Sequence, residues 1–266
     1  MPYCCESRGW IYWAWLLVGT VAVLATGNSA CAADNQLTER EKEEGWLLLF
    51  DGRTLDGWKA IDGVKTAELF ESKRPVEEGT INPHLCGGEH HRAYMLLYEQ
   101  PFEDFVLKFD LRLGPLSAEH TSINSGVFLR VFPLQPRPGY SIGCNDIEVA
   151  VDSTDGTSFT DAGAIYDLAH PLLNNIHKPV GDGVSKWNHV IVTNHENLIT
   201  VVMNGELLTV CDLDHFAQPG KRRDGSEHKF VFAMKDHPRK GYIGLQDHGC
   251  ECNYKNIKLL SLTKNQ

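Results

Sequence analysis

Positive charge is scarce in this sequence. Its 25 lysines and arginines are outnumbered by 35 aspartates and glutamates, and the formal net charge is −10 at pH 7. A surface of this sign repels phosphate groups, which disfavours nucleic acid and anionic membranes as partners. The one basic cluster, residues 221–223, is flanked by Pro219, Gly220 and Gly225 and is interpreted as a solvated loop. A neutral small molecule such as a sugar fits this charge balance better.

Several catalytic signatures are also absent. The sequence contains no H-E-x-x-H, G-x-S-x-G, phosphate-loop or dinucleotide-binding motif. It lacks the Glu-x-Asp-x-x-Glu strand motif, with which retaining glucanases hold two carboxylates about 5 Å apart. The nearest approach, from Glu148 to Asp152, has a different spacing. Direct acid-assisted glycosidase chemistry is therefore disfavoured.

No Pro/Ser-rich linker, low-complexity tract or repeat divides residues 34–266, so we expect one domain there. Residues 1–33 are different, because Arg8 precedes an apolar stretch over residues 10–25 and small residues follow. This order is typical of a secretory signal peptide, and it predicts a periplasmic or extracellular protein without stable membrane insertion. A single membrane anchor is the alternative, but the apolar run is short for a span of about 20 residues.

The cysteines that follow the predicted signal peptide do not form a recognisable disulfide framework. Their spacing matches no known disulfide pattern, and an odd number remains. We interpret them as small buried residues whose pairing stays open. They are Cys86, Cys144, Cys211, Cys250 and Cys252.

Alternating apolar and polar residues predict β-strands through most of the chain. Asn204 and Gly205 both tolerate positive φ, so they predict a hairpin turn. The expected strands are residues 105–113, 127–131, 147–151, 187–193, 198–203, 230–234, 242–245 and 256–262. Helix is expected only at residues 37–44 and near Leu172. Many short strands separated by turns predict a β-sandwich or a barrel.

The same alternation predicts which side chains share a face, because residues two apart in a strand point the same way. Three groups of side chains are expected to face away from the core. They are Phe128 with Arg130, Asp146 with Glu148 and Asp152, and Gln246 with His248. Asp247 is expected on the opposite face, with Leu245. Ordinary solvent-facing positions alternate for the same reason, so the alternation alone does not assign a function.

Three segments carry a resemblance to a known family. They are residues 49–58, 124–130 and 244–249, which read LFDGRTLDGW, NSGVFLR and GLQDHG. Together they closely resemble the bacterial 3-keto-disaccharide hydrolase family, over about residues 45–262. The resemblance implies an all-β fold, a concanavalin A-like jelly-roll sandwich of two curved antiparallel sheets. In such folds the concave face of one sheet holds a sugar.

The resemblance also implies the site residues. The base and acid would be Glu148 and His248; the substrate-binding residues would be Asn124, Arg130, Tyr166, Lys178, Gln246 and Asp247. Tyr166 is alternatively a core aromatic. Lys178 begins a segment similar to the family's Lys-Pro-x-Gly-Glu-Trp-Asn, from which this sequence departs by an insertion at residues 182–185 and by Lys186 in place of an acid.

The family name implies a particular reaction. A ketone at C3 of a glucoside acidifies the C2–H bond, so that one base can remove this proton and the aglycone leaves from C1. Addition of water then completes a net hydrolysis. Such a site needs a base, a group that stabilises the C3 enolate oxygen and a donor for the leaving group.

Other functions are compatible with the same residues. The same polar face would serve a non-catalytic carbohydrate-binding module, and a structural laminin-like interaction domain is a third interpretation. A divalent metal is possible, because His248 and Glu148 could supply part of its site. His84 with residues 89–91 could also bind a metal, although these are more simply surface histidines in a loop.

Overall fold

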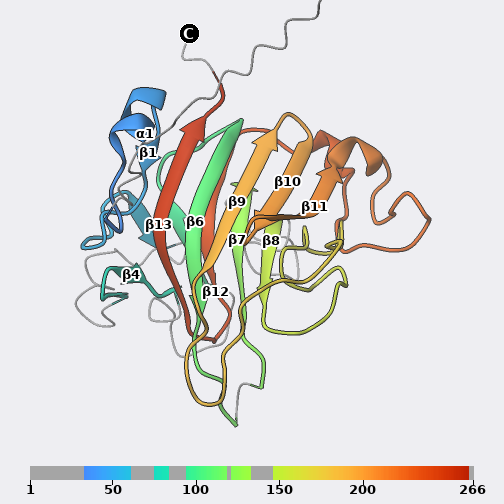
Figure 1. Ribbon diagram of the computed structural model, residues 1–266. Coiled ribbons are helices and arrows are strands. Elements are labelled where there is room, and N and C mark those ends of the chain that lie inside the picture. Colours follow the sequence, from blue (N-terminus) through green and yellow to red (C-terminus); the bar gives the residue numbers. More distant parts are fainter. Residues whose placement is uncertain (1–32, 61–74, 84–93, 119–120, 133–145, 264–266) are drawn as a thin grey trace, which may run out of the picture. The chain divides into compact units, whose positions relative to one another are not determined.

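The computed structural model describes residues 33–60, 75–83, 94–118, 121–132 and 146–263. All of them belong to one compact unit, Ala32–Gln266, and two antiparallel β-sheets make up most of it (Figure 1). The α-helix α1 (Glu39–Glu44) begins at Thr38, whose side chain accepts a hydrogen bond from the Glu41 N–H, and ends at Gly45. No helix within these ranges is long and apolar enough to cross a membrane. The predicted signal peptide lies almost entirely outside the described residues.

The larger sheet has the strand order β11-β10-β9-β6-β13-β4-β3, with β1 paired to β13 beside this path. Its strands are β1 (Leu47–Leu48), β3 (Val76–Glu77), β4 (Thr80–Ile81), β6 (Phe105–Leu113), β9 (Asn188–His195), β10 (Leu198–Met203), β11 (Glu206–Asp212) and β13 (Cys252–Ser261). Figure 1 shows β13, β6, β9, β10 and β11 side by side. Asn204 and Gly205 adopt φ values of 51° and 85° between β10 and β11, which confirms the predicted hairpin turn.

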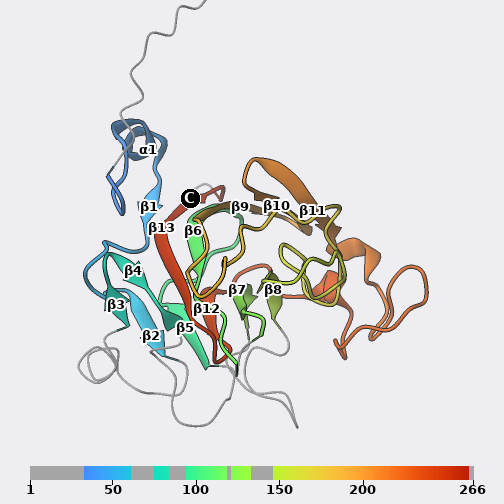
Figure 2. The same cartoon turned by 60° about the horizontal axis from the view of Figure 1, so that its bottom comes forward.

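The smaller sheet has the order β2-β5-β12-β7-β8. Its strands are β2 (Trp58–Ala60), β5 (Tyr94–Tyr98), β7 (Asn124–Val131), β8 (Ile147–Asp152) and β12 (Tyr242–Asp247). Two short 3₁₀ helices, η2 (Leu213–His215) and η3 (Met234–Asp236), follow β11 and precede β12. In Figure 2, β12, β7 and β8 form one layer, and β9, β10 and β11 lie in the other.

The main core fills the space between the sheets. Leu107 of β6 and Val192 of β9 belong to the same buried cluster as Val127 of β7, Val149 of β8 and Leu245 of β12. Alternation along each strand sends the neighbouring side chains to the other face of the smaller sheet, which we call the outer face. The predicted fold class, a concanavalin A-like jelly-roll β-sandwich of two antiparallel sheets, is confirmed.

A second, smaller apolar cluster lies on the outer face. It contains Met95, Leu97, Phe128 and Val131, and Tyr242 packs against it. These side chains alternate with main-core residues along their strands, yet they are buried as well. The outer face is therefore not an ordinary solvent-facing surface.

Two predicted elements are wrong. Residues 230–234 form no strand, because the Phe230 carbonyl accepts from the Gly220 N–H in a local loop and no ladder of pairs continues from it. Near Leu172 there is no helix, since its N–H donates to the carbonyl of Leu208 in β11. In the first segment Phe230 and Met234 are buried in the core without regular backbone pairing, whereas Leu172 is exposed.

Candidate active site

Glu148 lies on the outer face, as its alternation predicts. Its neighbours Ile147 and Val149 belong to the main core. A Cβ atom built on Gly126 would lie only 2.5 Å from the Glu148 Oε1, so the glutamate lies across β7 in space that a side chain at Gly126 would take. The glutamate is 5% exposed. The absence of a side chain at Gly126 therefore creates the room for this carboxylate.

Burial changes the acidity of two carboxyl groups on this face. It raises the pKa of Glu148 to about 7 and the pKa of Asp146, two residues earlier, also to about 7. The Asp146 Oδ1 accepts a hydrogen bond of 3.1 Å from the Phe132 N–H. Within the described ranges the Glu148 carboxylate accepts no hydrogen bond. A buried acid that titrates near neutrality and has free lone pairs is suited to general base chemistry.

Lys229 is the cation whose charge acts on both Glu148 and Asp146, and it was not among the residues predicted from the sequence. Its positive charge lowers the pKa of both Glu148 and Asp146, partly offsetting burial. The Lys229 Nζ lies 4.3 Å from the centre of the Tyr166 ring, and the Tyr166 N–H donates to the Glu148 carbonyl at 2.8 Å. Asp167 accepts from the Lys229 N–H at 2.5 Å. These contacts hold the ammonium group over the Tyr166 ring, at the end of residues 163–166, which pair with the edge of β8.

No sequence motif marks Lys229. It lies between two buried residues, His228 and Phe230, directly before the segment 230–234, which does not form its predicted strand. The sequence shows only a single lysine next to a mostly apolar run, and it does not show which residues this lysine contacts in the fold.

Gln246 and Asn124 share the outer face with Glu148. Gln246 is paired with Met95 in the register of β12 and β5, and its side-chain Oε1 is buried without a hydrogen-bond partner in the described part of the chain. Buried acceptors of this kind are rare, because leaving them unpaired costs free energy. Asn124, half-buried, begins β7 on the face of Gly126. Asn124, Glu148 and Gln246 thus lie on one face of three adjacent strands, as predicted.

Arg130 does not share this face, and the expectation that it points with Phe128 is wrong. The pairing of β7 with β12 shifts register between Tyr242 and Gly244, and Arg130 adopts a φ of 54° at this irregularity. Its side chain is fully buried, and its Nη2 donates to the carbonyl of Glu196 between β9 and β10. Burial lowers its pKa to about 10. The irregularity breaks the two-residue alternation that the expectation assumed.

The other predicted residues, Lys178, Asp247 and His248, have no described contact with the Glu148 carboxylate. The Lys178 ammonium pairs with the Asp155 carboxylate. Asp247, on the face of Leu245 as expected, accepts from the Gly249 N–H at 2.8 Å. His248 directly follows the end of β12 and is exposed. No hydrogen bond or ion pair between described residues joins His248 to Glu148.

Among the described residues, no three His, Cys, Asp or Glu side chains are grouped so that they could hold a metal ion. His84 and residues 89–91 lie outside them. Cys211, Cys250 and Cys252 are buried, in agreement with their interpretation as small buried residues, whereas Cys86 and Cys144 lie outside the described ranges.

The fold and this face define a β-sandwich with a candidate acid–base site on the outer side of its smaller sheet. The family model of the 3-keto-alpha-glucoside-1,2-lyase-like domain matches residues 45–260. The chain therefore belongs to this family, whose members resemble 3-keto-disaccharide hydrolases and act on carbohydrates.

Individual relatives agree with this assignment. A 3-keto-disaccharide hydrolase from Bacteroides thetaiotaomicron is 20% identical over 246 residues, which cover 81% of this chain and 78% of that protein. A candidate glycosyl hydrolase from Parabacteroides distasonis has a similar structure, with a TM-score of 0.65, 24% identity and coverage of 87% of this chain and 100% of the other. A second from the same organism gives a TM-score of 0.58 at 21% identity, covering 82% and 99%. These structures support the fold.

Proposed function

We propose that this protein is an exported enzyme that cleaves 3-keto-glycosides, including 3-keto-disaccharides, by elimination followed by hydration. The observation that carries the proposal is the environment of Glu148. This carboxylate is buried on the outer face, titrates near neutral pH and accepts no hydrogen bond from the described residues. A general base works best when its pKa lies near the working pH.

In the proposed reaction Glu148 removes the proton from C2 of the 3-keto sugar. The electron pair of the C2–H bond forms an enolate with its negative charge on the C3 oxygen. When the C3 carbonyl re-forms, the C1=C2 bond forms and the C1–O bond breaks, so that the aglycone leaves with its electron pair and takes up a proton. Water then adds across C1 and C2. The products are the free 3-keto sugar and the aglycone alcohol, and no covalent enzyme intermediate is needed.

Lys229 is proposed to stabilise the enolate oxygen at C3, a role that the family resemblance alone would give to Arg130 and Lys178. Its ammonium group is held against Tyr166 beside the edge of β8, and its charge already acts on Glu148. A cation fixed where negative charge develops lowers the barrier of the step that creates the charge. Arg130 is engaged by Glu196 and Lys178 by Asp155, so we assign neither to this role.

Asn124 and Gln246 are proposed to bind sugar hydroxyls. The unpaired Gln246 Oε1 is an acceptor for a hydroxyl proton, and Asn124 lies two residues from Gly126 on the same face. His248, exposed at the end of β12, is proposed as the donor for the leaving oxygen. A divalent metal near His248 remains a prediction from sequence.

Substrate comparison tests this function. The enzyme should consume 3-keto-trehalose or a 3-keto-aryl glucoside and leave the unoxidised glycosides intact, because only the ketone acidifies C2–H. Equal turnover of oxidised and unoxidised substrates would contradict the elimination mechanism. Binding of the 3-keto sugars without turnover would favour a carbohydrate-binding module instead.

A further inference from the structure

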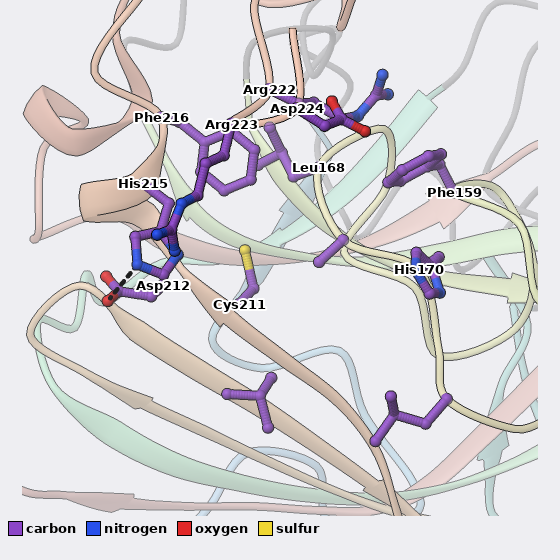
Figure 3. A pocket seen from close by; sticks show the side chains of 13 residues that line it. Phe159, Leu168, His170, Cys211, Asp212, His215, Phe216, Arg222, Arg223 and Asp224 are labelled. Carbon is purple, nitrogen blue, oxygen red and sulfur yellow. Dashed lines mark ion pairs between the residues drawn. The ribbon is translucent and has the colours of Figure 1, made fainter. Parts of the chain in front are cut away.

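A cavity of about 380 Å³ lies apart from the carboxylate site. It is lined by residues from three segments: the connection after β8, the end of β11 with η2, and the loop at residues 222–224. Figure 3 shows Phe216 and His215 on one side, Phe159 and His170 on the other, and Cys211 between them. Neither Glu148 nor Lys229 lines it.

Most of the cavity lining is apolar. Leu168 and Cys211 are buried, and burial raises the pKa of the Cys211 thiol to about 12, so it presents a neutral surface. The rings of Phe159 and His170 meet edge to face with centroids 5.5 Å apart. Apolar side chains reach the outside as well, since Leu172 is 69% exposed. A cavity with aromatic walls and an exposed apolar rim is suited to a flat apolar group.

Both terminal nitrogens of Arg222 are engaged by the protein, and only its buried Nε has no hydrogen-bond partner among the described residues. Its Cζ lies 3.9 Å from the centre of the Phe159 ring, and its Nη2 donates to the Asp167 carbonyl at 2.7 Å. It also bonds the Asp167 carboxylate and the Glu227 carbonyl. Arg222 therefore joins the two loops that form one wall of the cavity.

Arg223, the next residue, is different. It lines the cavity and is exposed, and within the described ranges it forms neither an ion pair nor a hydrogen bond. The two lining carboxylates already have partners, since Asp224 accepts from the Ser226 N–H and Oγ at 2.9 and 2.7 Å. Asp212 accepts from the Asp214 N–H at 3.0 Å and lies 3.7 Å from the His215 Nε2. Among the charged lining residues, Arg223 is thus the one whose charged group has no hydrogen-bond or ion-pair partner in the described part of the chain.

We propose that this cavity binds a small aromatic carboxylate, with its ring between the aromatic walls and its carboxylate on Arg223. The planar guanidinium group matches a carboxylate in geometry and charge. A neutral sugar fits less well, because the lining offers mainly apolar contacts where a sugar needs several hydrogen-bonding partners.

Calorimetric titration of the full chain with 4-hydroxycinnamate and with its uncharged methyl ester tests the proposal. The acid should bind to the wild-type protein. The ester should bind to the wild type on the order of tenfold more weakly, and the acid should bind to the Arg223→Gln variant more weakly by a similar factor, which is the usual loss when a charge-assisted contact is removed. Arg53→Gln is the matched control, since Arg53 is exposed and does not line the cavity. Arg223 is exposed, so its substitution leaves folding intact.

Two further variants locate the ligand. Val210→Trp places a large ring at the rim, where Val210 is 51% exposed, and should abolish binding. Glu148→Gln should leave binding unchanged, because Glu148 belongs to the other site. The proposal is overturned if the acid does not bind, if acid and ester bind equally, or if Glu148→Gln removes binding while Val210→Trp does not.

Discussion

At the scale of single residues, the chemistry of this protein depends on burial. Glu148 has a folded-state pKa of about 7 against an ordinary value of 4.5, so the folded protein holds this proton where the unfolded chain has lost it. Stability therefore falls as the pH rises from about 4.5 to about 7, by up to ~1.4 kcal/mol per pH unit for one group. Burying a charge in this way is unfavourable for folding and useful for catalysis.

Glu148→Gln should consequently be more stable than the wild type at high pH. The substitution keeps the size of the side chain and removes the ionisation, so its stability relative to the wild type should increase from about pH 5 to about pH 8. Urea unfolding at both pH values measures this difference. Parallel stability curves for the two proteins would contradict the assigned environment of Glu148.

Lys229 should set the pH dependence of activity. We expect kcat/KM to rise with pH through about 7 as the carboxylate pair loses its protons. The Lys229 charge lowers both pKa values, so Lys229→Met should move this rise to higher pH as well as reduce the maximum rate. Lys235→Met is the control, because Lys235 is exposed and contributes to neither pKa. An unchanged midpoint in Lys229→Met would remove Lys229 from the site.

At the scale of elements, the site depends on the smallest residue of β7. A methyl group at Gly126 would lie 2.5 Å from the Glu148 Oε1 and 2.9 Å from its Cγ. Gly126→Ala should therefore displace the carboxylate and lower kcat/KM by more than about tenfold, since small misplacements of catalytic groups are costly. Gly183→Ala is the control, because its nearest atom would lie at 3.4 Å in an exposed loop. Equal activity in both variants would contradict the geometry.

The opposite face of β8 should behave differently. Val149 is 1% exposed in the main core, so Val149→Asp buries a charge without a partner and should prevent folding. Expression in soluble form and circular dichroism measure this outcome. A folded and active Val149→Asp variant would contradict the assignment of faces along β8.

The same elements show what the sequence could predict. Alternation located most of the strands and the face of Glu148 correctly, because it reports directly on burial. It failed at Arg130, where the irregularity in β7 depends on the register with β12, which the sequence of one strand does not contain. Lys229 was missed because its contacts with Tyr166 and Asp167 are set by loops. Such contacts follow from the assembled structure alone.

At the scale of the whole molecule, the larger sheet mainly supports the fold, and the smaller sheet carries the residues of the proposed chemistry. The larger sheet presents one buried face to the main core, whereas the smaller sheet is buried on both faces. This second buried face provides the low-polarity environment that raises the pKa of Glu148. The jelly-roll class was predictable from the many short strands and the family resemblance, whereas the covering of the outer face was not.

Isotope incorporation tests the central claim, that Glu148 removes the C2 proton, most directly. Wild-type enzyme should convert a 3-keto-glycoside in deuterated water to a 3-keto sugar with deuterium at C2, measured by NMR early in the reaction and corrected for exchange in buffer. Glu148→Gln should be slower on the order of 10²–10⁴-fold, and the exposed control Glu43→Gln should match the wild type. Product that retains hydrogen at C2, or Glu148→Gln turnover within about threefold of the wild type, would contradict the account.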